Sequence, residues 1–187
     1  MSKHSEDSKN CSSIRLGFTG DVMIGRAIDA ILLPYHVDGR LHESFVKHAH
    51  TYVDLAVKQN GPLSQGELRS KGFNYIWGDM IDELRNVDYL IINLETSLTT
   101  SEEWAQYKGI HYRCHPLNVK CLMNIRVKAV TLANNHVLDY GETGLIETLH
   151  TLKQVNISYA GAGLTFLKRL RIQYSFKTSM LINQVYL

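Results

Sequence analysis

The chain has 187 residues, of which 44% are hydrophobic and 20% are charged, and its formal net charge is +2. This length suffices for one domain with a buried core, and the composition is that of an ordinary soluble globular protein. The small net charge gives no support for a nucleic-acid partner or a membrane-surface footprint. The cysteines Cys11, Cys114 and Cys121 show no CxxC spacing, which disfavours a disulfide framework and a cysteine-rich zinc site.

The N-terminal residues are polar and charged. Residues 1–13 lack the apolar segment that a secretory signal peptide requires. The sequence also has no apolar run long enough to span a bilayer. We therefore expect a disordered tail over residues 1–13, no membrane segment in this chain, and a cytoplasmic location.

The following chain alternates between strand patterns and helical patterns. Strands are predicted at residues 14–19, 87–94, 112–115 (a short edge strand), 127–132 and 157–160. Helices are predicted at residues 22–33, 43–58, 75–84, 117–125 and 142–155. The apolar run at 87–94 is continuous enough to predict burial on both faces. This alternation predicts an α/β fold with a sheet that is at least partly parallel.

Three stretches do not follow the alternation. Residues 35–72 carry four histidines without one metal-ligand spacing, which favours a solvated helix face: His36, His42, His48 and His50. Residues 61–66 are predicted to form a loop. Residues 164–187 have no Gly, Pro, Asp or Glu and lack the strand-then-turn punctuation of the earlier chain. The predicted organisation is therefore a tail at 1–13, a domain at 14–163 and an atypical segment at 164–187.

Polar side chains follow three of the predicted strands, at the points where the strands end. They are Asp21, Asn93, Glu95, Asn135, His136 and Asp139. In open α/β sheets, ligands bind outside the carboxyl ends of the strands. Oxygen and imidazole ligands from adjacent strand ends suit one or two divalent ions, namely Mn, Fe, Zn or Mg. His136 could act as ligand or general acid, with Asp139 holding its other ring nitrogen.

Each of these residues also has a structural interpretation. Asp21 could be a helix N-cap or turn former, and Glu95 a solvated loop carboxylate. The pair Asn134 and Asn135 could form a turn, with His136 a half-buried imidazole and Asp139 part of a turn or N-cap. The segment Gly161-Ala162-Gly163 is typical of a tight turn; a nucleotide-binding loop is the less favoured alternative.

The motifs together resemble one family. Its pattern matches Gly20-Asp21-Val22-Met23-Ile24-Gly25-Arg26, Asn93-Leu94-Glu95-Thr96, Leu132-Ala133-Asn134-Asn135-His136 with Asp139-Tyr140-Gly141, and Gly161-Ala162-Gly163. In this order they resemble the CapA family of poly-γ-glutamate capsule biosynthesis proteins, which is similar to the calcineurin-like metallophosphoesterases. The resemblance covers residues 14–163. It implies a metallophosphatase-like sandwich with a mixed, largely parallel sheet.

The resemblance also implies roles for individual residues. It implies that Asp21, Glu95 and Asn135 are metal ligands. It also implies that Asn93 contacts these ligands without binding the metal itself. His136 is then the general acid or a phosphate contact, oriented by Asp139. The pair His115-Pro116 matches the segment that the family places before the helix leading to the Asn-Asn-His strand.

Two departures from the family pattern affect the expected function. Met23 stands where metallophosphoesterases usually place a histidine, an absence that CapA-like chains share. The family also continues well beyond the Gly-Ala-Gly turn, so we expect a C-terminally truncated chain with an incomplete sheet.

The first hypothesis is a metal-dependent hydrolase that acts on a phosphoester or on a γ-glutamyl amide, as a small molecule or a polymer. The alternative is a truncated, non-catalytic binding or scaffold remnant of this family.

Overall fold

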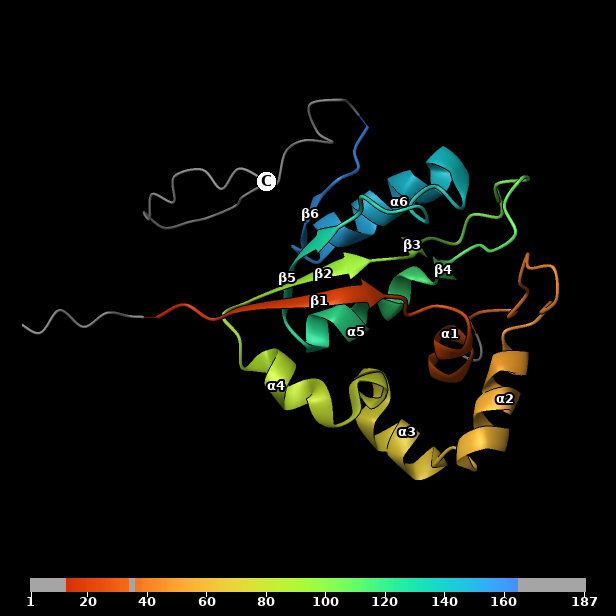
Figure 1. The fold of residues 1–187 in the computed structure, drawn as a ribbon, viewed down its shortest axis with the longest axis horizontal. Coiled ribbons are helices and arrows are strands. Elements are labelled where there is room, and N and C mark those ends of the chain that lie inside the picture. The colour runs from red at the N-terminus through yellow and green to blue at the C-terminus, as the bar shows by residue number, and fades with distance from the viewer. Residues whose placement is uncertain (1–12, 34–35, 165–187) are drawn as a thin grey trace, which may run out of the picture.

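The computed structural model describes residues 13–33 and 36–164 (Figure 1). The predicted tail and the predicted atypical segment lie almost wholly outside these residues, so both stay predictions. Within the described ranges, none of the helices combines the length and the apolar composition needed to cross a bilayer.

The centre of the fold is a four-stranded sheet in the order β1-β2-β5-β6. Its strands are β1 (Leu16–Val22), β2 (Tyr89–Leu94), β5 (Val127–Thr131) and β6 (Ser158–Ala160). All three pairings are parallel, which confirms the predicted α/β fold. The register aligns Asp21 with Asn93 and Asn93 with Thr131. The ends of the first three strands therefore meet at one edge of the sheet.

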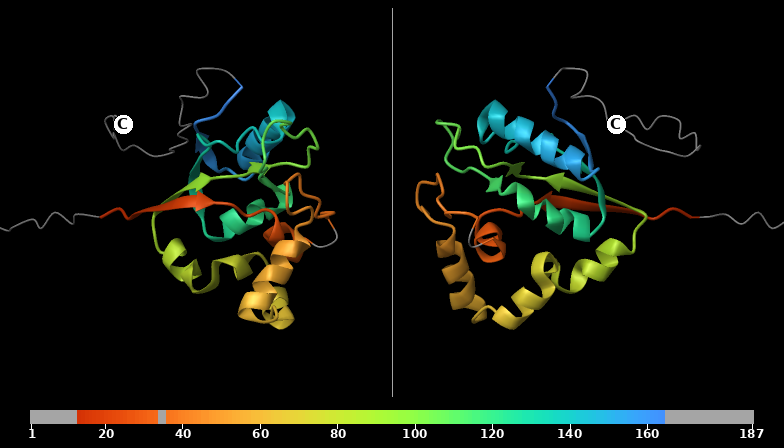
Figure 2. Two further views of the ribbon diagram at one scale, coloured as in Figure 1. Left: turned by 45° about the vertical axis from the view of Figure 1, so that its right-hand side comes forward. Right: turned by 180° about the vertical axis from the view of Figure 1, so that it is seen from behind.

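The other elements are mostly short. They are α1 (Ala27–Leu32), α2 (His50–Asn60), α3 (Gln65–Lys71), η1 (Gly72–Met80), α4 (Ile81–Arg85), β3 (Ser97–Leu98), β4 (Arg113–Cys114), η2 (Pro116–Asn118), α5 (Val119–Asn124) and α6 (Gly141–Gln154). In all views of Figures 1 and 2, α1 to α4 form an arc beyond the β1 edge of the sheet, whereas α6 lies near the β6 edge. Strands β3 and β4 form a separate two-stranded parallel sheet.

Two predictions between residues 43 and 71 had the wrong boundaries. The predicted helix at 43–58 begins only at His50, because the preceding loop closes through an antiparallel bridge between Arg40 and His48. Of the four histidines in residues 35–72, which were predicted to lie on a solvated helix face, only His50 lies on a helix. Helix α3 begins within the predicted loop at 61–66, because the Ser64 side chain accepts a hydrogen bond from the Glu67 amide at 3.3 Å. This Ser-x-x-Glu spacing is a known helix-start signal that the composition of the stretch obscured.

The prediction that the β2 run is buried on both faces was also wrong. Leu90, Ile92 and Leu94 are buried, but the alternating residues Tyr89, Ile91 and Asn93 are only half-buried. The buried side packs into one core with side chains from α5 and α6, such as Leu122 and Leu152. On the other side Leu16 and Phe18, which pair with Tyr89 and Ile91, are 56% and 69% exposed. The described chain thus covers one face of its sheet.

The loop between β1 and α1 is fixed by a close backbone approach at Gly25. A Cβ atom at Gly25 would lie 1.9 Å from the backbone oxygen of Arg113 in β4. We expect Gly25→Ala to lower the free energy of unfolding by about 3 kcal/mol or more, because the obstacle is backbone and cannot rotate away. Urea unfolding would measure this. The matched control is Gly20→Ala, where an added Cβ meets nothing within 4 Å; equal losses in the two variants would contradict the explanation.

Candidate functional site

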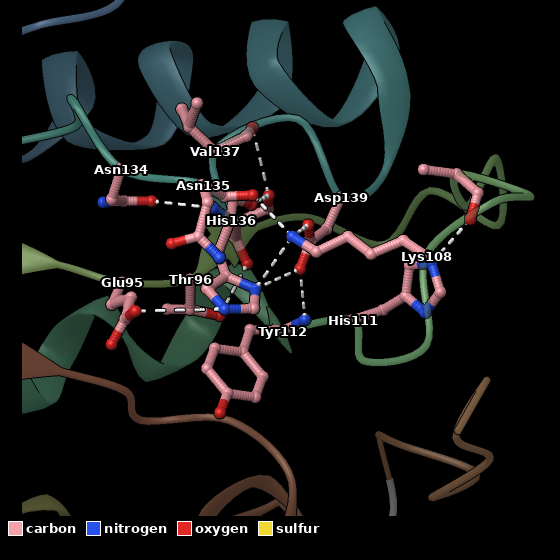
Figure 3. Close-up of polar contacts among 12 residues, drawn as sticks. Glu95, Thr96, Lys108, His111, Tyr112, Asn134, Asn135, His136, Val137 and Asp139 are labelled. Atoms are coloured by element: carbon pink, nitrogen blue, oxygen red, sulfur yellow. Dashed lines mark hydrogen bonds and ion pairs between the residues drawn. The ribbon is translucent and has the colours of Figure 1, made fainter. Parts of the chain in front are cut away.

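The side chain of Asn134 joins the turn after β5 to the end of β2. Figure 3 shows its contact with the His136 amide. Its oxygen accepts a hydrogen bond from the backbone amide of His136 at 3.0 Å. Its nitrogen donates to the side-chain oxygen of Asn93 at 3.0 Å and to the backbone oxygen of Leu94 at 2.9 Å. The sequence predicted Asn134 only as a turn former. In the structure it also sets where the His136 turn sits against the neighbouring strand.

Asn93 extends this connection to the first strand. Its side-chain nitrogen donates to Asp21 Oδ1 at 2.6 Å. The amides of Asn134 and Asn93 therefore link three strand ends in series, and the carboxylate of Asp21 is oriented at the far end. Asn93 thus contacts the carboxylate of Asp21 directly. Its role as a residue that supports a metal ligand stays a prediction.

Two carboxylates lie close together at this edge of the sheet. The pKa of Glu95 is raised, first by burial and then by the negative charge of Asp21 and a hydrogen bond to it. Glu95 Oε1 also lies 3.8 Å from His136 Nε2. A pair of carboxylates that disfavour each other's charge provides oxygen ligands for a cation, which would compensate both charges.

His136 is held by a buried carboxylate. Its Nδ1 lies 2.6 Å from Asp139 Oδ2, and the two side chains are 8% and 1% exposed. Asp139 Oδ2 also accepts from the Tyr112 amide at 2.6 Å, and Asp139 Oδ1 forms an ion pair with Lys108. Because Asp139 is an acceptor, it favours a proton on Nδ1 and leaves Nε2 facing Glu95. The structure therefore places Asp139 where the sequence predicted an orienting partner.

Sequence reasoning missed three residues around the imidazole. Lys108 Nζ lies 3.3 Å from His136 Nδ1. The Tyr112 ring stacks on the His136 ring at 3.8 Å between centroids and an angle of 16°. The Arg26 guanidinium lies 4.4 Å from the centre of the Tyr112 ring. Arg26 has a φ of 54°, a strained conformation for a residue with a side chain. Arg26 belongs to the first motif, which was the only sequence signal for any of them.

His115 serves the local backbone. Its Nδ1 accepts a hydrogen bond from the Leu117 amide at 3.2 Å at the start of η2, and its own amide donates to Asp29 Oδ2 at 2.9 Å. Burial raises the pKa of Asp29 to about 6, against the opposing effect of this hydrogen bond and one from Asn118. The segment that matches the family's His-Pro pair is therefore anchored to α1 through a buried acid.

The predicted metal ligands are partly assembled. Asp21 and Glu95 provide carboxylate oxygens, and His136 Nε2 lies beside Glu95. Asn135 has an exposed side chain, and its backbone oxygen accepts from Lys108 Nζ at 2.5 Å. Across residues 13–33 and 36–164, no group of three or more His, Cys, Asp or Glu side chains is placed to hold a metal ion. The carboxylate oxygens of Asp21 and Glu95 are hard ligands, which fit a divalent cation once an amide oxygen or water completes the set.

Two further positions from the sequence are explained by packing. Met23 stands where metallophosphoesterases usually place a histidine. Its sulfur accepts a hydrogen bond from the Gly25 amide at 3.3 Å. Gly161 has a φ of 90°, and a Cβ there would lie 2.5 Å from the backbone nitrogen of Ala133. The positive φ and the close approach to Ala133 explain why a glycine stands at position 161 of this tight turn.

Comparison with known proteins identifies the family. Residues 15–178 match the family described as bacterial capsule synthesis protein PGA_cap, so the match extends beyond the predicted domain end at residue 163. The chain is 38% identical over 154 residues to a probable polyglutamine synthesis accessory protein of Mycobacterium tuberculosis, covering 81% of this chain and 39% of that protein. It is 31% identical over 99 residues to the capsule biosynthesis protein CapA of Bacillus anthracis, covering 51% and 24%.

A third relative gives the same picture. The PGA biosynthesis protein CapA of Bacillus subtilis is 32% identical over 94 residues, covering 50% of this chain and 25% of that protein. The chain thus spans well under half of the length of these relatives. Because the family match covers most of the sequence and includes the strand-end motifs, the chain belongs to the bacterial capsule synthesis protein family that includes CapA.

Proposed function

We propose that this chain carries the metal-dependent hydrolase site of a CapA-type protein. The observation that supports this most directly is the contact between the Asp21 and Glu95 carboxyl groups beside Nε2 of an oriented His136; burial and then Asp21 raise the pKa of Glu95. Paired carboxylates beside an imidazole that is fixed by a buried acid are typical of sites for metal-assisted hydrolysis.

In this proposal, Asp21, Glu95 and Asn135 hold one or two divalent ions of Mn, Fe, Zn or Mg. A bound ion supplies an activated water and neutralises charge on the attacked group. Asn93 orients the Asp21 carboxylate through its hydrogen bond of 2.6 Å. His136 is fixed by Asp139 through Nδ1, and in its doubly protonated form it would donate its Nε2 proton to the leaving group, which leaves a neutral imidazole with its proton on Nδ1.

The substrate class is proposed from the relatives and the site together. The relatives' names refer to capsule, PGA and polyglutamine synthesis. A water-activating site in such a protein would cut a γ-glutamyl amide, in a polymer or in a smaller precursor; a phosphoester is the alternative bond that this chemistry can hydrolyse. Hydrolysis of either bond develops negative charge on an oxygen, which a bound metal would stabilise. It also expels a leaving group that a general acid can protonate, namely the amine nitrogen of the amide or the oxygen of the ester.

A non-catalytic role is the second candidate. It is favoured by one observation: the described residues provide no ready group of three or more charged or imidazole metal ligands. In that case the chain would bind an acidic polymer or a partner without turning it over.

Metal analysis of the chain purified without chelator distinguishes the two candidates. The hydrolase proposal expects about one or two ions of Mn, Fe, Zn or Mg per chain, measured by mass spectrometry, and hydrolysis of a chromogenic phosphodiester or of a γ-linked glutamate oligomer. A folded protein that binds no metal when dialysed against each ion, and that hydrolyses neither substrate, would contradict the proposal and favour the binding role.

A further inference from the structure

A large open cavity borders the candidate site. Its volume is about 570 Å³, and its lining residues are Arg40, Leu41, His42, Glu43, Ser44, Lys47, Trp104, Lys108 and Gly109. They come from the loop before α2 and from the segment before β4. Lys108 belongs to both places, since it lines the cavity and also forms the ion pair with Asp139 beside His136 (Figure 3). A molecule in the cavity would therefore lie next to the residues that hold the imidazole.

The lining carries more positive than negative side chains. Arg40, Lys47 and Lys108 are cations, whereas Glu43 is the single acid in the lining. Lys108 is paired with Asp139, and Arg40 with the exposed Asp38. Lys47 has no acidic partner among the ion pairs of the described chain, and its Nζ donates to the backbone oxygen of Glu43 at 2.6 Å. Two donor positions of its ammonium are therefore left for another acceptor.

The one acid in the lining is already compensated. Glu43 Oε1 lies 2.7 Å from Arg26 Nη2, and Glu43 Oε2 accepts from the Tyr52 hydroxyl at 2.6 Å. The Glu43 residue is 6% exposed, so its charge is directed toward Arg26 and away from solvent. It consequently opposes an incoming anion much less than a free surface carboxylate would.

One wall of the cavity is a flat aromatic pair. The His42 and Trp104 rings stack at 4.7 Å between centroids and an angle of 11°. His42 Nε2 is buried without a hydrogen bond and lies 3.6 Å from a Glu102 oxygen. Burial lowers the pKa of His42 against the opposing effect of Glu102, which disfavours the charged form of the ring. The two rings thus add a largely apolar surface to a lining that otherwise carries cations.

We propose that this cavity is an anion-binding subsite, in which Lys47 and Arg40 hold a carboxylate or phosphate group of a ligand while its apolar part lies against Trp104. That this ligand is the substrate of the neighbouring site rests on the proposed function. The binding of anions does not, because it depends on the lining of the cavity and on no metal ion.

Isothermal titration of the full chain in EDTA tests the subsite. The probes are a γ-linked tetraglutamate, tripolyphosphate, and the same tetraglutamate with its α-carboxylates converted to amides. At least one of the two anions is expected to bind and the amide oligomer to bind at least tenfold more weakly. Lys47→Gln is expected to weaken the anion about tenfold, since a charge-assisted hydrogen bond is lost. Arg40→Gln provides a second variant on the exposed rim.

The control is Lys153→Gln, which removes the same charge from an exposed position on α6 outside the lining. Binding of tetraglutamate alone identifies a carboxylate site, binding of tripolyphosphate alone identifies a phosphate site, and both outcomes support the subsite. The proposal is overturned if neither anion binds, or if Lys47→Gln and Arg40→Gln bind as tightly as Lys153→Gln. Anion binding that persists in Asp21→Ala would keep this result separate from a failure of the metal site.

Discussion

Replacing His136 by alanine is expected to reduce the rate of hydrolysis by about a hundredfold to ten-thousandfold, which is the usual contribution of a positioned acid or base. The variant removes the nitrogen that lies 3.8 Å from Glu95 and leaves both carboxylates in place. Metal content is therefore expected to remain, and the loss should appear in kcat measured with a substrate that the unmodified chain hydrolyses.

The control for this variant is His150→Ala, because His150 is an exposed histidine on α6. It should hydrolyse the substrate at the unmodified rate. His136 is 6% exposed, so circular dichroism and urea unfolding must show that His136→Ala is folded before its rate is interpreted. Equal rates in the two histidine variants would remove His136 from the proposed mechanism.

The positions of the polar strand-end residues followed from the sequence, because parallel strands end at a common edge. Apolar runs before Asp21, Asn93 and His136 were sufficient to predict three such strands. The register then brings Asn93 Nδ2 to 2.6 Å from Asp21 Oδ1, and Asn134 Nδ2 to 3.0 Å from Asn93 Oδ1. This part of the site depends on strand direction, which the alternation of strands and helices indicated, and on the strand order, which the structure supplies.

The surroundings of the imidazole did not follow from the sequence. Lys108 lies outside the strands and helices that the sequence predicts, yet it reaches residues 27 to 31 positions further along the chain. The Tyr112 ring stacks on His136 from a distant part of the sequence, and Arg26, which lies over the Tyr112 ring, comes from a segment still further away along the chain. Neither helical nor strand periodicity encodes such contacts, because they depend on how loops fold over the sheet edge. The same limit applies to the cavity, whose lining comes from two loops.

Burial was predicted less well than secondary structure for a related reason. The pattern of β2 is apolar at successive positions, which is typical of a strand covered on both sides. In the structure its second side, with Tyr89 and Ile91, is only half-buried, next to the exposed Leu16 and Phe18 of β1. The sequence of a strand records that a side chain is apolar, whereas the packing partner is determined by other elements.

Replacing Asp21 by alanine is expected to lower the affinity for the divalent ion by roughly a hundredfold or more, because even residues that only support a metal ligand contribute tenfold to a hundredfold. The fold should persist, since Asp21 is exposed and its contacts are with polar side chains, the amide of Asn93 and the carboxyl group of Glu95. The measurements are metal content by mass spectrometry and thermal unfolding with and without added Mn²⁺. Asp54→Ala, at an exposed position on α2, is the matched control.

Thermal unfolding should distinguish Asp21→Ala from the unmodified chain mainly when Mn²⁺ is present. Without metal, the charge of Asp21 helps to raise the pKa of Glu95, so removing it relieves a repulsion and should leave stability unchanged or slightly higher. With Mn²⁺, the unmodified chain and Asp54→Ala should unfold at a higher temperature, because an ion that binds only the folded state stabilises it, whereas Asp21→Ala should not respond. Equal metal content and an equal response to Mn²⁺ in all three proteins would show that Asp21 is not a ligand.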